Sequence, residues 1–353
     1  MTVALWLAAL AVATPRGPVE AQQTGAWVDL PSLNLLRQES GTAVLGGAVY
    51  VIGGLTHGGG PPTTDTVERW RPGDPSWSFA PPLLEPIDHP AVAVHAGEIW
   101  TIGGERQLEP RDVVQIFDPT VGEWRYGPPL PTPRAAGAAA TLDGRLYYLG
   151  GVDFDRRATA AVFVLDRESA EWKPAPSMTL ARDHLSAVVL GDGIYVSGGR
   201  RGFTSLDLHE RFDPADATWT VLAPVPTARS AAGAVALGGR LWVGGGEFPV
   251  LFDVNEVYDP ATDTWETAPA LPLPRHGTQP VVIDGLIVWP GGGRELGFTP
   301  TDHVDAFRPD LLFADGFELG DVSLWSAVVG GDERRQEDTG DNPESVSWRG
   351  FAP

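Results

Sequence analysis

Residues 147–151, YYLGG, decide the fold, because a hydrophobic run ending in a glycine pair returns five more times along the chain. The other copies are YVIGG (50–54), WTIGG (100–104), YVSGG (195–199), WVGGG (242–246) and VWPGG (288–292). Successive copies lie 50, 47, 48, 47 and 46 residues apart. A period of this length indicates a repeat architecture in which each copy is one supersecondary unit.

A tryptophan provides a second marker with the same period. Six tryptophans are separated by the same steps of 50, 47, 48, 47 and 46 residues as the glycine pairs. They are Trp27, Trp77, Trp124, Trp172, Trp219 and Trp265. Two residue types that keep one spacing over most of the chain indicate six copies of one structural unit.

Each unit has the composition of four β-strands. A run of small apolar residues leads through a glycine turn such as Asp143-Gly144 to the strand that ends in the glycine pair. A third strand carries an aromatic residue or leucine seven positions before the tryptophan, and turn formers such as Asp118-Pro119 precede the tryptophan strand. Continuous apolar runs are typical of strands buried on both faces, so we predict an all-β fold.

With these marks the chain resembles the kelch-repeat family, in which one repeat forms one four-stranded propeller blade. The resemblance covers roughly residues 22–310 and implies a six-bladed kelch-type β-propeller. The sixth unit has no tryptophan strand after Phe307, whereas Trp27 precedes the first glycine pair. We therefore predict that the N-terminal strand completes the last blade and closes the ring, which covers an open sheet edge.

The two ends of the chain depart from the repeat. Near the start lies the apolar run VALWLAALAVA, about as long as a signal-peptide core, and small residues at Val19 and Ala21 predict cleavage after Ala21. We expect residues 1–21 to be a signal peptide and the mature protein to be secreted or periplasmic, without a membrane span. Residues 311–353 carry nine acidic and three basic residues, which predicts a short acidic C-terminal tail.

Composition limits the partners. The formal net charge of −21 disfavours a nucleic acid or an anionic membrane, because phosphate binding needs a basic surface. The chain has no cysteine, which excludes disulfides, thiolate metal sites and cysteine nucleophiles. We expect a monomer without a cofactor.

Five arginines form another periodic set, 16 residues before the glycine pair in five of the six units. They are Arg37, Arg134, Arg182, Arg229 and Arg275, and the second unit has Asp88 one residue nearer the pair. Around a propeller these positions could bring five guanidinium groups to one mouth, where they would bind a carboxylate ligand. The alternative is that the arginines brace the blades through salt bridges, since repeats also copy structural residues.

The loops after the glycine pairs vary in sequence, which favours them as the place of ligand choice. Three acidic residues follow the pairs closely and are expected near the axis as ligand contacts: Glu105, Glu247 and Glu295. Each could also be a general base or only a solvated carboxylate. The histidines, His57, His89, His184 and His276 among them, lack the close spacing of a strong metal site, so we predict no metal.

Two functions from different classes fit these features. The first is a non-catalytic binding module that recognises a protein, peptide or glycan through its loop face. The second, implied by the resemblance, is a carbohydrate-active enzyme like the exported six-bladed sialic-acid mutarotase, whose carboxylated sugar would suit an arginine-lined mouth. The copper radical site of galactose-oxidase-like enzymes needs a Tyr-Cys crosslink, which this chain cannot form. A purely structural envelope protein is a third alternative, because a fold alone does not define a function.

Overall fold

In four blades the repeated tryptophan faces, across a hairpin, the residue seven positions before it. Facing pairs with stacked or tilted rings include Phe117 with Trp124, Phe212 with Trp219 and Tyr258 with Trp265. Their ring centroids lie 5.3, 5.1 and 5.1 Å apart. Aromatic side chains directly opposite each other stabilise an antiparallel strand pair. These pairs therefore fix the register of the two outer strands of a blade.

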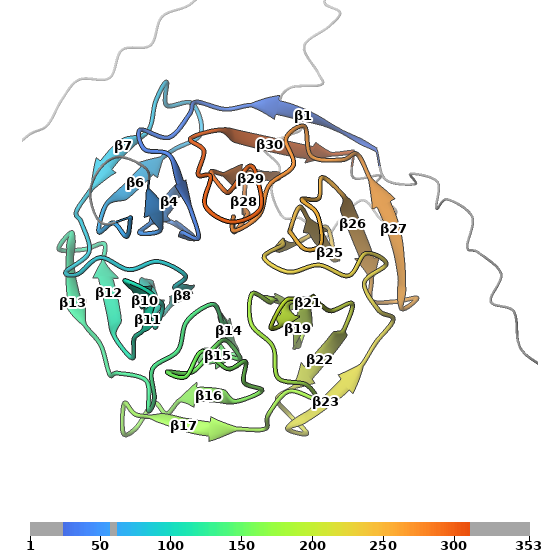
Figure 1. Ribbon diagram of the computed structural model, residues 1–353. Coiled ribbons are helices and arrows are strands. Elements are labelled where there is room, and N and C mark those ends of the chain that lie inside the picture. The colour runs from blue at the N-terminus through green and yellow to red at the C-terminus, as the bar shows by residue number, and fades with distance from the viewer. Residues whose placement is uncertain (1–23, 57–61, 311–353) are drawn as a thin grey trace, which may run out of the picture. The chain divides into compact units, whose positions relative to one another are not determined.

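The computed structural model describes residues 24–56 and 62–310, in which six four-stranded antiparallel sheets stand around one axis (Figure 1). From the axis outward, blade 1 consists of β3 (Gly41–Leu45), β4 (Ala48–Ile52), β6 (Val67–Trp70) and β7 (Ser78–Ala80). Blade 2 consists of β8 (Ala91–His95), β9 (Glu98–Ile102), β12 (Val114–Asp118) and β13 (Glu123–Tyr126). Blade 3 consists of β14 (Ala138–Leu142), β15 (Arg145–Leu149), β16 (Val162–Leu165) and β17 (Trp172–Ala175). Blade 4 consists of β18 (Ser186–Leu190), β19 (Gly193–Ser197), β22 (His209–Asp213) and β23 (Thr218–Val221). Blade 5 consists of β24 (Gly233–Leu237), β25 (Arg240–Gly244), β26 (Asn255–Asp259) and β27 (Thr264–Ala268). Blade 6 consists of β28 (Val281–Ile283), β29 (Leu286–Pro290), β30 (Val304–Pro309) and β1 (Gly25–Asp29). Beside the blades, β2 (Arg37–Gln38) pairs with β5 (Leu55–Thr56) in a separate two-stranded sheet. Short hairpins join β10 (Glu105–Arg106) to β11 (Glu109–Pro110) and β20 (Arg200–Arg201) to β21 (Thr204–Ser205).

The N-terminal strand closes the ring, as the sequence predicts. In Figure 1, β1 lies along the outer side of β30, and Trp27 stands opposite Phe307 with ring centroids 5.0 Å apart. Residues from the two ends of the propeller thus repeat the aromatic pairing that other blades make within one hairpin. Closure leaves the sixth sheet with four strands, like the others.

Each repeated tryptophan also joins its blade to a neighbour. Its indole Nε1 donates a hydrogen bond to a backbone carbonyl just after the outermost strand of the preceding blade, at 2.8–2.9 Å in five cases and 3.3 Å for Trp27. The acceptors are Pro31, Pro81, Pro128, Pro176, Ala223 and, for Trp27, Pro269. A buried indole N–H needs a partner, so the tryptophan contributes both apolar area and a fixed interblade contact.

The glycine pair is required where a blade's second strand meets the next blade. At Gly245 and Gly246 the backbone φ angles are +64° and +106°, which L side chains rarely adopt. A Cβ atom on Gly245 would lie 2.5 Å from the carbonyl oxygen of Arg275, in the connection that enters the next blade. Only glycine allows this close approach.

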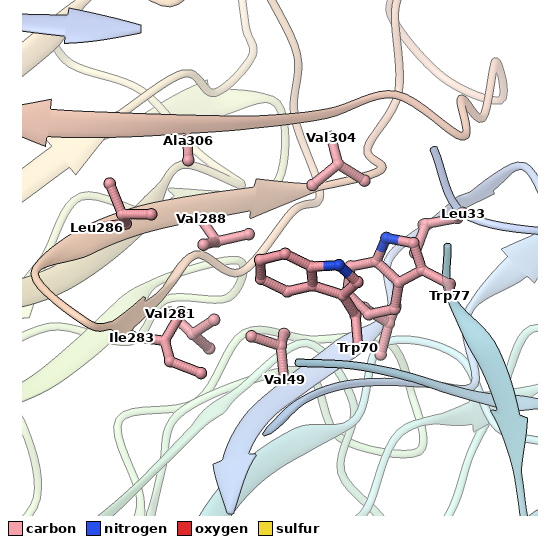
Figure 2. Packing of buried hydrophobic residues seen from close by; sticks show 11 residues of the cluster. Leu33, Val49, Trp70, Trp77, Val281, Ile283, Leu286, Val288, Val304 and Ala306 are labelled. Carbon is pink, nitrogen blue, oxygen red and sulfur yellow. The ribbon is translucent and has the colours of Figure 1, made fainter. Parts of the chain in front are cut away.

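Apolar cores fill the spaces between blades. Figure 2 shows the core at the seam of blades 6 and 1, where Trp70, Trp77 and Val49 of blade 1 pack against Val288 and Val281 of blade 6. Burial of such side chains contributes roughly 1.5–3 kcal/mol each. The seam that joins the chain's two ends is therefore packed like the interior of a domain.

The predicted signal peptide (1–21) and acidic tail (311–353) lie outside the described residues, and both stay predictions. Within residues 24–56 and 62–310, no helix has the length and apolar character needed to cross a membrane.

Candidate functional site at the propeller axis

All five predicted arginines are buried. Four of them each form an ion pair with a carboxylate on the third strand of the same blade. The pairs are Arg37–Glu68 (2.8 Å), Arg182–Glu210 (2.6 Å), Arg229–Glu256 (2.5 Å) and Arg275–Asp305. All four arginine side chains are at most 1% exposed. The prediction that these guanidinium groups converge on one mouth as ligand contacts is therefore wrong for these four arginines. Their geometry is that of the bracing alternative.

The two exceptional repeats follow the same rule. Arg134 has no carboxylate within its blade and instead lies 5.8 Å above the ring of Phe163, which occupies the acid's place on β16. In the second repeat the matching place is Ile87 rather than Asp88, because the Ile87 carbonyl accepts the N–H of Gly54 as the arginine carbonyls do elsewhere. There the third strand carries the neutral Gln115. At this position of the third strand a carboxylate is thus present only where an arginine pairs with it, as expected from the cost of an unpaired buried charge.

Two residues after the arginine position, the six connections meet in a ring of backbone hydrogen bonds around the axis. Each residue's N–H donates to the carbonyl of the equivalent residue in the preceding blade, at 2.7–3.1 Å. The six residues have φ angles of 50–59° and are Glu39, His89, Ala136, His184, Ala231 and Gly277. Five non-glycine residues in the left-handed region is unusual, and the closed ring of hydrogen bonds supports that conformation.

Three of the ring residues bring ionisable side chains together at the axis. One ligand-type atom from each of Glu39, His89 and His184 lies within 4.8 Å of the other two. The His89 Nε2 is 3.6 Å from a Glu39 oxygen, and the His89 and His184 rings meet edge to face with centroids 5.2 Å apart. His89 and His184, which lie 50 and 145 positions beyond Glu39, thus reach one point with it because the propeller closes on itself.

A second layer of acids holds the two histidines. Each is preceded by an aspartate that accepts a hydrogen bond from its Nδ1 at 2.6 Å, Asp88 for His89 and Asp183 for His184. A Glu105 oxygen lies 3.2 Å from the same His89 nitrogen. These contacts use Nδ1 of both rings, so that Nε2 of each ring is the atom that meets other groups of the cluster.

Arginine and glutamate complete the cluster toward the loop face. Arg200 donates from Nε to Asp183 (3.1 Å), from Nη1 to Glu247 (2.9 Å) and from Nη2 to His184 Nε2 (3.2 Å). His276 Nδ1 lies 3.4 Å from Glu39 and 3.5 Å from Glu247, too far or too poorly aimed for a hydrogen bond. The cluster thus draws on connections or loops of every blade, and the third blade contributes Arg156, which pairs with Glu105.

Burial and charge set the protonation of this cluster. Burial lowers the pKa of His89, but Glu39 and the other nearby carboxylates more than compensate and raise it to about 9. Burial would raise the pKa of Glu39, yet the surrounding imidazoles hold it well below its usual range. Burial and the charge of Arg200 lower the pKa of His184. At neutral pH an imidazolium at His89 therefore faces a carboxylate at Glu39 and a neutral His184.

A cavity of about 170 Å³ borders the three axial side chains and runs along the innermost strands of all six blades. Along the innermost strands the cavity wall consists mostly of small residues, such as Gly137, Ala187 and Gly233. The axial cluster thus has polar groups next to free space, which a ligand site requires.

The loops after the glycine pairs surround this cluster and expose apolar tips. Backbone bridges join the start of each loop to the axial connections, for example Asp183 with Arg200 and Ser230 with Glu247. The exposed apolar side chains on these loops are Leu108, Phe154, Phe203, Val250, Leu296 and Phe298, with exposed fractions from 43% to 87%. Every loop from the second to the sixth blade contributes at least one of them.

Of the acids predicted near the axis, Glu105 and Glu247 lie in the cluster, whereas Glu295 is exposed and only its backbone carbonyl reaches His276. Glu39 was not among the residues predicted from the sequence, and the wide spacing of His89 and His184 argued against a metal site there. A usable signal was present, because all three follow the arginine position by two residues and so keep the period of the repeat.

Comparisons with known proteins find kelch repeats over most of the propeller. The family model described as "KLHDC2/KLHL20/DRC7 Kelch-repeats domain" matches residues 88–293, and the model described as "Kelch motif" matches residues 36–84. Kelch-like protein terF of Aspergillus terreus is 30% identical over 316 residues, covering 81% of this chain and 69% of that protein. Kelch repeat protein M-T8 of Myxoma virus is 32% identical over 186 residues, covering 52% of this chain and 36% of the viral protein.

A solved structure titled "Structure of YjhT" has the same architecture. It aligns with a TM-score of 0.67 and covers 78% of this chain and 96% of its own. At 16% sequence identity, this likeness shows the fold alone.

Proposed function

The chain belongs to the kelch-repeat family, and on that premise we propose that it is a binding module whose loop face takes up a peptide segment of a partner protein. The observation that carries the proposal is the set of apolar tips on five successive loops around one axis. Aromatic and aliphatic side chains held on a rigid scaffold are typical of protein-binding surfaces.

Gathering on one face, together with exposure, separates these tips from ordinary surface residues. Phe203 is 87% exposed and Phe154 66% exposed, on adjacent loops. Isolated apolar residues are common on protein surfaces, but a cluster on one face is characteristic of an interaction site. The aliphatic members, Leu108 and Val250, favour an apolar peptide side chain over a sugar.

The tips are connected to the axial cluster by aromatic contacts. The Phe203 ring meets the Phe248 ring edge to face at 6.1 Å, and the Arg200 guanidinium lies 5.2 Å from the Phe248 ring centroid. A peptide bound across the tips would therefore lie next to charged groups that can pair with its polar atoms.

Selection of a displayed peptide library on the immobilised protein tests this proposal. We expect a selected peptide to lose at least about tenfold in affinity when Phe154 and Phe203 are both replaced by serine, because each contributes apolar burial of ~1 kcal/mol or more. The matched control replaces Phe79 and Tyr126, which are 61% and 60% exposed on outer strands, by serine. A selected peptide that is insensitive to the loop pair, or sensitive only to the control pair, would refute the proposal.

A mutarotase-type enzyme acting on a carboxylated sugar is the second candidate, favoured by the facing Glu39 and His89. Anomer exchange needs a base that takes the proton of the anomeric hydroxyl and an acid that protonates the ring oxygen as the ring C–O bond opens. A carboxylate and an imidazolium 3.6 Å apart beside a cavity suit these two roles. NMR of freshly dissolved sialic acid would test it: accelerated anomer exchange that is lost in His89→Gln supports the enzyme, and an unchanged uncatalysed rate opposes it.

We also propose that the protein acts outside the cytoplasm, on the strength of the apolar run near its start. A secreted product whose first residue is Gln22 would support this, and a product retaining residues 1–21 in the cytoplasm would oppose it.

A further inference from the structure

We propose that Glu39, His89 and His184 form a binding site for a divalent first-row transition metal ion on the propeller axis. This site is additional to the loop-face binding proposed above and does not depend on it. The three residues supply one carboxylate and two imidazoles, each from a different blade connection. Two histidines and one carboxylate are a recurrent ligand set for Fe²⁺ and Zn²⁺ in proteins.

The geometry of the three groups is close to what a metal needs. Their ligand atoms lie within 4.8 Å of one another, whereas ligands of a bound ion lie roughly 3–3.5 Å apart at metal–ligand distances near 2 Å. Side-chain rotations that move the ligand atoms by about 1 Å would bring them to the separations found around a bound ion. The remaining ring residues are Ala136, Ala231 and Gly277, so no bulky side chain from the ring fills the space between the ligands.

Outer contacts favour metal binding at the two imidazoles. In metal sites the ligating histidine usually donates its other N–H to a carboxylate, which fixes the ring and makes the ligating nitrogen more basic. Asp88 and Asp183 make this contact with Nδ1 of His89 and His184, both at 2.6 Å. The sequence Asp-His thus occurs twice at the same place in the repeat, with the same hydrogen bond.

The charge of the surroundings also favours a cation. Five carboxylates gather in the cluster, and only two guanidinium groups pair with them, which leaves three negative charges before the imidazoles are counted. The carboxylates are Glu39, Asp88, Glu105, Asp183 and Glu247, and the guanidinium groups are those of Arg156 and Arg200. A divalent ion would neutralise most of this excess in a partly buried place, where charge interactions are strong.

Besides the proton of the His89 imidazolium, which the ion must replace, Arg200 opposes the ion. Its Nη2 donates to His184 Nε2 at 3.2 Å, so a metal must displace this hydrogen bond. The guanidinium keeps its contacts with Asp183 and Glu247 through Nε and Nη1. Arg200 therefore tunes the affinity of the site without being a ligand.

The cavity gives the ion a place for exchangeable ligands. All three ligands border the 170 Å³ space, so three protein ligands leave coordination positions open toward it. Open positions of this kind are typical of metal sites that bind a water, a substrate or a polar ligand group, in contrast to closed structural sites.

Another His and carboxylate group, among the described residues, provides a matched control. Asp29, His303 and Asp305 also place ligand-type atoms within 4.8 Å of one another, but Asp305 is already the partner of the buried Arg275. His303→Ala removes an imidazole from this outer group and leaves the axis unchanged.

Zinc titration of the full chain, freed of metal with a chelator, tests the site. We expect calorimetry to show one Zn²⁺ per chain, and Co²⁺ to give the visible absorption of a nitrogen- and oxygen-bound ion. Glu39→Gln and His184→Ala should each weaken Zn²⁺ binding about 100-fold, while His303→Ala leaves it unchanged. A folded wild-type chain that takes up no stoichiometric Zn²⁺, or uptake that survives both axial substitutions, would overturn the proposal.

A gain of affinity provides a test that loss of folding cannot imitate. Arg200→Gln removes the competing donor and one positive charge while all three ligands stay, so Zn²⁺ should bind about tenfold more tightly or better. Unchanged or weaker binding in a variant that melts cooperatively would contradict the assignment of the site.

Discussion

Two positions of the repeat, two residues apart in each connection between blades, carry charged residues in opposite ways. The first position has arginine in five of six repeats, and four of these arginines are buried in ion pairs within their own blades. The second position has one backbone geometry in all six repeats but varies in side chain, with Glu39, His89 and His184 beside small residues. Only the second position faces the axis.

The difference shows how to tell packing from function in a closed repeat. Every blade has the same internal need for a brace, so its residue is copied in nearly every repeat. The axis is shared by all blades and needs one set of groups, so its residues appear once each. Regular repetition of a charged residue indicates structure, and variation at a position of fixed backbone geometry indicates a site.

Loss of a buried brace should have the largest effect on stability. Arg182→Met leaves Glu210 buried without its partner, which should lower the free energy of unfolding by about 3–5 kcal/mol. Arg134→Met removes an arginine with no carboxylate partner and should cost much less, about 1–2 kcal/mol. Urea unfolding followed by tryptophan fluorescence measures both. Equal losses in the two variants would break the distinction between paired and unpaired arginines.

His209, which is buried on β22 next to Glu210, should make the free energy of unfolding sensitive to acid. Burial and then the charge of Arg182 lower the pKa of His209 to about 4, against 6.5 when unperturbed. Between these pH values the unfolded chain binds more protons, so His209 makes stability rise with pH and its contribution is fully present above about pH 6.5. The loss toward pH 4 is at most ~3 kcal/mol.

Unfolding free energies measured from pH 4 to 7 check this expectation. His209→Gln should flatten the slope in that window even if it lowers stability overall. A slope of the same size in His209→Gln would mean that other groups cause the acid sensitivity.

The smallest effect is expected at the axis, where Gly277→Ala tests whether side-chain size there controls the position of Glu39. A Cβ atom at Gly277 would overlap the Glu39 carboxylate, and φ is +59°. The backbone cost is about 1–2 kcal/mol. Gly239→Ala is the control, because it has φ +71° with nothing within 4 Å of the added atom. Thermal melts should show similar costs for both, whereas only Gly277→Ala should weaken Zn²⁺ binding; an equal effect on Zn²⁺ would contradict control by side-chain size.

The sequence predicts more of the fold than of the candidate site. Blade number, strand order and closure by Trp27 were predictable, since glycine pairs and tryptophans make local contacts that every blade repeats. The burial of Arg182 and its equivalents was not, because spacing places a residue along the strand order but does not say whether its side chain turns into the blade or toward the mouth. Glu39 had no motif of its own and was missed.

The repeat, its six copies and the place of the closing strand can be read from the amino-acid sequence, because each rests on side chains that contact their own or the adjacent blade. Which charged residues meet depends on the folded ring. Ring closure brings Glu39, His89 and His184 to one point although 50 residues separate Glu39 from His89 and 145 separate it from His184. The more regular arginines lie away from that point, because their carboxylate partners lie within the blades.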